Sequence, residues 1–142
     1  MAQPGRTTGA AGIAGIEALI RRTAQEGGDL RTTARESMRQ VLRELRGVTG
    51  EAGDALTQAA AALVRTTAAV EGDIAVVARA VLEGTIAGAS DVGADEFEAA
   101  SRAGMGALEA AGDIGGTALE QVQRAVTGTV AGVRIAPRAP FD

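Results

Sequence analysis

The segment Arg79-Ala-Val-Leu-Glu-Gly-Thr-Ile-Ala-Gly88 decides the fold, because a shortened copy, Arg124-Ala-Val-Thr-Gly-Thr-Val-Ala-Gly132, follows later in the chain. Gly84 and Gly128 are 44 residues apart, and each copy places two glycines four residues apart. Glycines at that interval leave a flat strip on a helix, where a second backbone can approach closely. The copies therefore predict duplication of a helical unit. Chance is the alternative, since 20 glycines in 142 residues produce several such pairs.

Apolar residues along the chain recur every eleven residues. Eleven residues over three turns correspond to about 3.67 residues per turn, close to a straight helix. Strand-like alternation is absent, so we expect an all-α fold, either an antiparallel bundle or an extended coiled-coil-like assembly of long, lightly wound helices. Ordinary amphipathic bundle helices are the alternative reading of this spacing. The stripes are Leu108, Leu119 and Val130; Ala111, Val122 and Val133 with Gly115 and Val126; and Ala59, Val70, Val81 and Val92 with Leu63 and Ile74.

Glycine and proline predict the domain organisation. Residues 1–12 contain Pro4 and are expected to form a flexible arm; residues 13–134 form one helical domain; residues 135–142 form an extended tail with two prolines. Glycine ends helices and aspartate caps the next one, so Gly-Asp pairs predict joints between helices. The alternative is that a Gly-Asp pair lies on the exposed face of a continuous helix and forms no joint. The expected joints lie near residues 28, 53, 72, 91 and 112.

The amino-acid composition argues against an enzyme. The chain has no His, Cys, Lys, Tyr, Trp or Asn, which removes most general bases, nucleophiles and metal ligands. We therefore expect no catalytic residues, no cofactor and no metal. Nucleic acid is not an expected partner, because the net charge is −4 and stacking aromatic residues are missing.

The hydrophobic residues are sparse and mostly small. Leu, Ile, Val and Phe number 30 of 142 residues, whereas Ala alone supplies 32. A methyl group buries little area, so we expect the fold to need help from oligomerisation or a partner surface. The predicted helix-helix contact residues are Gly84, Gly88, Leu108, Val122, Val126, Gly128, Val130 and Gly132.

Arginines in the first half form a row at four-residue intervals. Such a row runs obliquely along the edge of an apolar helix face, where its charged heads can reach phosphate or carboxylate groups. It predicts contact with an anionic lipid surface or an acidic partner. Pairing with the chain's own acids is the alternative, since residues 1–50 carry a net charge of +3 and residues 51–142 carry −7. The candidate residues are Arg31, Arg35, Arg39, Arg43 and Arg46.

No segment is apolar enough to suggest a transmembrane helix, and the start of the chain does not have the charge order of a signal peptide. We expect a cytoplasmic or peripherally membrane-associated protein. Residues 13–135 resemble phasin-like, Ala-rich bacterial helical proteins that coat storage granules or act as accessory subunits. They are also similar to small helical stalk subunits that tie a redox enzyme to a membrane. We therefore expect a non-enzymatic oligomerising scaffold or accessory subunit, with a granule-coating protein as the alternative.

Overall fold

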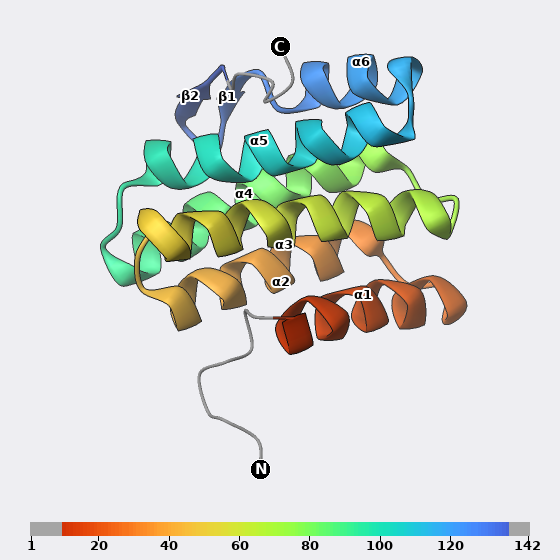
Figure 1. Ribbon diagram of the computed structural model, residues 1–142, viewed down its shortest axis with the longest axis horizontal. Helices are drawn as coiled ribbons and strands as arrows, with labels where there is room; N and C mark the ends of the chain where they lie inside the picture. The colour runs from red at the N-terminus through yellow and green to blue at the C-terminus, as the bar shows by residue number, and fades with distance from the viewer. Residues whose placement is uncertain (1–9, 137–142) are drawn as a thin grey trace.

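The computed structural model describes residues 10–136, which form six helices and one small antiparallel hairpin (Figure 1). This confirms the predicted all-α, bundle-like fold. The elements are α1 (Ala10–Gln25), α2 (Leu30–Leu45), α3 (Gly50–Ala69), α4 (Ile74–Val92), α5 (Glu96–Ile114), α6 (Gly116–Ala125), β1 (Gly128–Val130) and β2 (Val133–Ile135).

Alternate helices lie side by side in two layers (Figure 1). Helices α1, α3 and α5 form one layer, and α2 and α4 form the other. The most extensive contacts join α2 to α4 and α3 to α5, so neighbours in space are two helices apart in sequence. Helix α6 packs on both α4 and α5, at the edge of the molecule opposite α1.

The turns repeat with a period of 44 residues. Asp29 and Asp73 cap α2 and α4: the Asp29 side chain accepts from the backbone N–H of Arg31, and that of Asp73 from those of Ala75 and Val76. Thr23 and Thr67, also 44 residues apart, each donate a hydroxyl hydrogen bond to the carbonyl four residues earlier, over 2.8 and 2.7 Å. The chain is thus a stack of three helical hairpins, α1–α2, α3–α4 and α5–α6, in which each hairpin packs on the next.

The core consists of alanine methyl groups with a line of larger side chains. Alanine brings helix axes close together, so a small hydrophobic content still fills the space between layers. Among the described residues, every buried side-chain N and O atom has a hydrogen-bond partner. The largest fully buried side chains are Ile20, Met38, Leu42, Leu56, Leu63, Leu82, Leu108, Ile135, Val64, Val77, Val81 and Val122.

Two of the Gly-Asp pairs are not themselves joints, although a helix break lies near each of them, at residues 46–49 and at Gly115. Gly53-Asp54 lies inside α3, because α3 begins at Gly50 after a turn at residues 46–49. Gly112-Asp113 lies inside α5, which continues to Ile114. Both aspartates are exposed and form ion pairs with arginines of a neighbouring helix instead of capping one. The joints near 28 and 72 are present, and the one near 91 falls at residues 93–95.

The absence of strands was also predicted incorrectly, because residues 128–135 form a β-hairpin. Gly128 pairs with Ile135 and Val130 with Val133, around a two-residue turn. Ala131 and Gly132 have φ of 49° and 85°, as a type I′ turn requires. The β-branched residues around this turn favour strands over a continued α6.

The eleven-residue stripes do not follow single long helices. Leu108 lies in α5, Leu119 in α6 and Val130 in β1, so one stripe crosses two helix ends. The predicted arm of residues 1–12 extends too far, because α1 begins at Ala10. Residues 1–9 lie outside the described residues. The predicted tail is wrong at its start, because Ile135 is buried in β2; residues 137–142 lie outside the described residues.

Candidate functional site

Gly84 and Gly88 lie where α4 crosses α2. A Cβ atom on Gly84 would collide with the carbonyl oxygen of Arg35. A Cβ atom on Gly88 would lie 2.6 Å from Cβ of Leu42, and 3.0 Å from the carbonyl oxygen of Arg39. These two glycines therefore serve a contact within the chain, and α2 covers the strip that they leave on α4.

The other predicted helix-contact residues are distributed over the opposite end of the stack. Leu108 in α5, Val122 in α6 and Val126, the C-cap of α6, are fully buried in the core. The remaining three were predicted wrongly as helical, since they lie in the hairpin and its turn. They are Gly128, Val130 and Gly132.

One close contact escaped the sequence analysis. Gly106 lies where α5 crosses α3, and a Cβ atom there would collide with the carbonyl oxygen of Thr57. The hydroxyl of Thr57 also donates a hydrogen bond of 3.0 Å to the carbonyl of Arg102, across the same contact. A glycine in the middle of an Ala-rich helix, away from any cap, was the available signal for this crossing.

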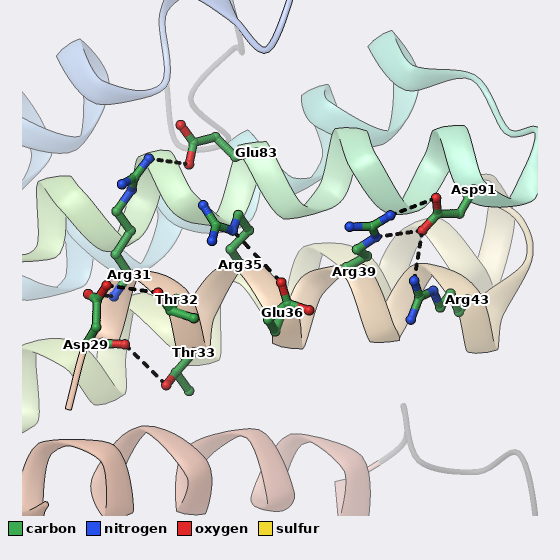
Figure 2. A network of polar contacts seen from close by, with 10 residues as sticks. All are labelled: Asp29, Arg31, Thr32, Thr33, Arg35, Glu36, Arg39, Arg43, Glu83 and Asp91. Carbon is green, nitrogen blue, oxygen red and sulfur yellow. Dashed lines mark hydrogen bonds and ion pairs between the residues drawn. The ribbon is translucent and has the colours of Figure 1, made fainter.

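The arginine row of α2 lies along α4 and pairs with its acids (Figure 2). Arg31 lies 3.4 Å from a carboxylate oxygen of Glu83. Arg39 and Arg43 both reach Asp91, over 2.7 and 3.3 Å. Arg39 donates two hydrogen bonds to that carboxylate, in a bidentate arrangement.

The pairing changes the titration of both partners. The hydrogen bond from Arg39 lowers the pKa of Asp91 below its ordinary 3.8, helped by the positive charges of Arg39 and Arg43. The same hydrogen bond raises the pKa of Arg39. Both groups therefore stay charged at neutral pH, and Asp91 offsets one of the two positive charges of Arg39 and Arg43.

The two remaining arginines of the set have different surroundings. Arg35 lies 4.0 Å from its neighbour Glu36. Arg46 is the C-cap of α2, with a φ of 58°, and its backbone N–H donates to the carbonyl of Leu42. The structure thus places the five arginines along one edge of α2 and at its end, but gives three of them partners on α4.

The outward side of α1 has small residues and one leucine exposed to solvent. We define the α1 outer face as Ala14, Gly15, Ala18 and Leu19, all of which are exposed. Leu19 is 42% exposed, although Ile16 and Ile20 on the opposite side of the helix are buried. Nothing lies within 4 Å of the position that a Cβ atom would take on Gly15.

The outward side of α6 has the opposite character. Val126, Val130 and Ile135 point inward and are buried, so the hairpin closes the core at this end. The exposed residues of α6 are small or polar, which suits a terminal repeat that faces water. They are Gly116, Thr117, Glu120, Gln121, Gln123 and Arg124.

Two classes of site find no support in the part of the chain that the structure describes. Nowhere in residues 10–136 do three acidic side chains gather closely enough to hold a metal ion. None of the six helices has the length and apolar character needed to cross a membrane. No protein-family model matches the chain, and neither a curated protein nor a solved structure matches it significantly.

Proposed function

We propose that this chain is a non-enzymatic helical scaffold or accessory subunit that assembles with further copies of itself and organises a partner complex. The observation that supports this most directly is the contrast between the two ends of the helical stack. The α6 end is closed by the hairpin and has a polar surface, whereas α1 leaves Leu19 and three small neighbours uncovered.

The packing of the stack supports a role in assembly. Each hairpin of a repeat stack buries its apolar side against the next, and terminal hairpins need a polar outer side to stay soluble alone. The last hairpin meets that condition along α6, whose exposed residues are small or polar, although Phe97 and Ile114 of α5 are also exposed. The first hairpin presents the α1 outer face, which a further helix could cover, so the stack could continue at this end.

The alternative, a phasin-like protein that coats an anionic lipid or granule surface through the α2 arginines, has weaker support. Arg31, Arg39 and Arg43 already pair with Glu83 and Asp91, so binding to a surface would compete with these pairs. Co-sedimentation with anionic vesicles tests it. Binding that disappears in an Arg35→Glu, Arg39→Glu variant would favour coating over assembly.

Sedimentation equilibrium over about 1 to 200 μM tests the assembly proposal. We expect the weight-average mass to rise above the 14.2 kDa of one chain as concentration increases. A mass that stays at one chain throughout this range would contradict self-assembly. Because the chain has no Cys, disulfide cross-linking cannot produce the rise.

A further inference from the structure

We propose that residues 126–136 encode two structures, the observed hairpin and a continuation of α6 as a helix to residue 136. The hairpin is the favoured form of the chain, and it closes the α6 end of the stack. In the helical form, Val126 and Val130 would face outward and leave that end open. This conformational switch does not require self-association, so its test is separate from that of the proposed function.

Two nearly identical pentapeptides have different secondary structures in this chain. Residues 84–88 read Gly-Thr-Ile-Ala-Gly and lie inside α4. Residues 128–132 read Gly-Thr-Val-Ala-Gly and form β1 and the turn after it. The two sequences differ by the one methylene group that separates Ile from Val. The local sequence therefore permits both structures, and the surroundings select between them.

The end of α6 differs from the ends of α2 and α4. Those two helices end at residues in the left-handed conformation, Arg46 and Gly93, with φ of 58° and 72°. Val126, the C-cap of α6, has a φ of −103° instead. The hydroxyl of Thr127 donates to the carbonyl four residues earlier, as threonines inside α3 and α4 do. The chain thus departs from a helical course only at Gly128, where φ is 106°.

The 44-residue repeat gives the position of the segment in the helical form. Gly84 of α4 packs against the backbone of Arg35 in α2, so Gly128 would pack against the backbone of Arg79 in α4. Arg79 already donates a hydrogen bond of 3.1 Å to the carbonyl of Thr129. Helix α4 therefore presents to this segment the same kind of surface that α2 presents to α4.

The helical form would uncover two valines that the hairpin buries. Val126 and Val130 follow Leu82 and Ile86 by 44 residues, and all four are buried in the observed fold. Leu82 and Ile86 share a helix face with Arg79, which contacts the hairpin. In a continued α6 the valines would take the corresponding outer face, which no helix within residues 10–136 covers. Burial of apolar surface therefore favours the hairpin.

Ile135 distinguishes the two structures most strongly. Its side chain is 1% exposed in the hairpin. In the helical form it would take the position of Asp91, 44 residues earlier, which pairs with Arg39 of α2. The residue 44 positions after Arg39 is Glu83, so Ile135 would lie beside a carboxylate and outside the core. Ile135 therefore anchors the hairpin.

Replacement of Ile135 by charged residues tests the switch. Ile135→Arg removes the buried anchor and places a guanidinium beside Glu83, which reproduces the pair of Arg39 and Asp91 with the charges exchanged. We expect the Cα chemical shifts of residues 127–134, measured by NMR, to change from values typical of strands to values typical of a helix. Ile135→Asp removes the same anchor but places a second carboxylate beside Glu83, so we expect a smaller helical shift.

A second pair of variants leaves the core unchanged. Ala131 is exposed and has a φ of 49°, a conformation in which β-branched residues are rarely found. Ala131→Val therefore disfavours the turn, and we expect the same change toward helical shifts. Ala131→Asn favours a type I′ turn before Gly132 and should keep the hairpin. Circular dichroism of dilute chain checks that the other helices remain folded in each variant.

The outcomes are distinct from those of the assembly test. Coil-like shifts for residues 127–134 in both Ile135→Arg and Ala131→Val would overturn the switch, as would a hairpin that persists in both. If Ile135→Arg unfolds the whole chain, Ala131→Val decides alone. Equal helical shifts in Ile135→Arg and Ile135→Asp would overturn the register that places residue 135 beside Glu83. Self-assembly is decided independently by sedimentation equilibrium.

Discussion

The two ends of this helical stack differ in what covers the last layer of apolar side chains. At the α6 end, Val126, Val130 and Ile135 are buried beneath the chain's own hairpin. At the α1 end, Leu19 is 42% exposed, and no hairpin within residues 10–136 covers the helix. The hairpin thus covers one end of the stack and not the other, and the proposed assembly would join copies at the uncovered end.

The closed end arises from a modified copy of the repeat. Leu82 and Val126 are 44 residues apart and both are buried, as are Ile86 and Val130. The second member of each pair is buried although Val126 is the C-cap of α6 and Val130 lies in β1, where the helix has ended. Residues 44 positions apart are therefore buried in both copies of the repeat, although the local backbone differs between the copies.

The largest expected effect is on the free energy of unfolding, and it comes from the glycines at the helix crossings in the middle of the stack. Gly84→Ala or Gly106→Ala pushes a methyl group into a carbonyl oxygen of the neighbouring helix. We expect each to lower the free energy of unfolding by about 3 kcal/mol, because the helices must move apart. Chemical denaturation of dilute chain measures this.

Gly15→Ala is the matched control for these glycines, because its added methyl group meets open space. We expect a gain of about 0.5–1 kcal/mol from helix propensity at that exposed site. Equal losses in all three variants would show that glycine serves the local backbone and not the helix contacts.

The second prediction compares the ends directly. Ile135→Ala removes a side chain that is 1% exposed at the closed end, and we expect a loss of about 2–4 kcal/mol in unfolding free energy. Leu19→Ala at the open end should cost under about 0.5 kcal/mol in the monomer. Similar losses at both positions would contradict the assignment of one closed and one open end.

The third prediction concerns the repeated turn. Asp73→Ala removes the side chain that accepts hydrogen bonds from the N–H groups of Ala75 and Val76. We expect a loss of about 1 kcal/mol in thermal or chemical unfolding. Asp54→Ala, at a Gly-Asp pair inside a helix, should cost less, and a larger loss there would argue for a joint at residue 53.

The smallest expected effect is the pH dependence of the ion pairs between α2 and α4. Because the pKa of Asp91 is lowered in the folded chain, its contribution is complete above the ordinary value of 3.8 and is lost as pH falls through the folded pKa. We expect Asp91→Asn to reduce stability slightly at neutral pH and to flatten the acid side of the stability profile. An unchanged profile would show that the pair with Arg39 adds nothing measurable.

The helical class and the approximate places of the joints could be predicted from the sequence, because caps and breaks are local features. The Gly-Asp signal alone could not separate Asp73, which caps a helix, from Asp54, which pairs with Arg102 of the neighbouring helix α5. The 44-residue repeat distinguishes the two kinds of Gly-Asp pair. The turns at residues 28 and 72 are 44 residues apart, and residue 53 does not fit that spacing.

The surfaces were harder to predict than the helices. The four-residue spacing placed the arginines on one edge of α2, but their partners Glu83 and Asp91 lie on α4, some 50 residues later. The glycine spacing indicated a close helix contact, but not whether the second helix belongs to the same chain. The partners of the arginines and of the glycines both depend on which helices pack together. Local residue spacing does not determine this.

The difference between the two ends can be measured most directly by placing one spin label at each, since the chain has no Cys of its own. Arg22→Cys puts a label on the exposed side of α1, and Glu120→Cys puts one on the exposed side of α6. In double electron-electron resonance on the assembled chain, we predict a short, well-defined distance between copies for the α1 label and only long distances for the α6 label. A short distance between α6 labels, with none between α1 labels, would contradict the account.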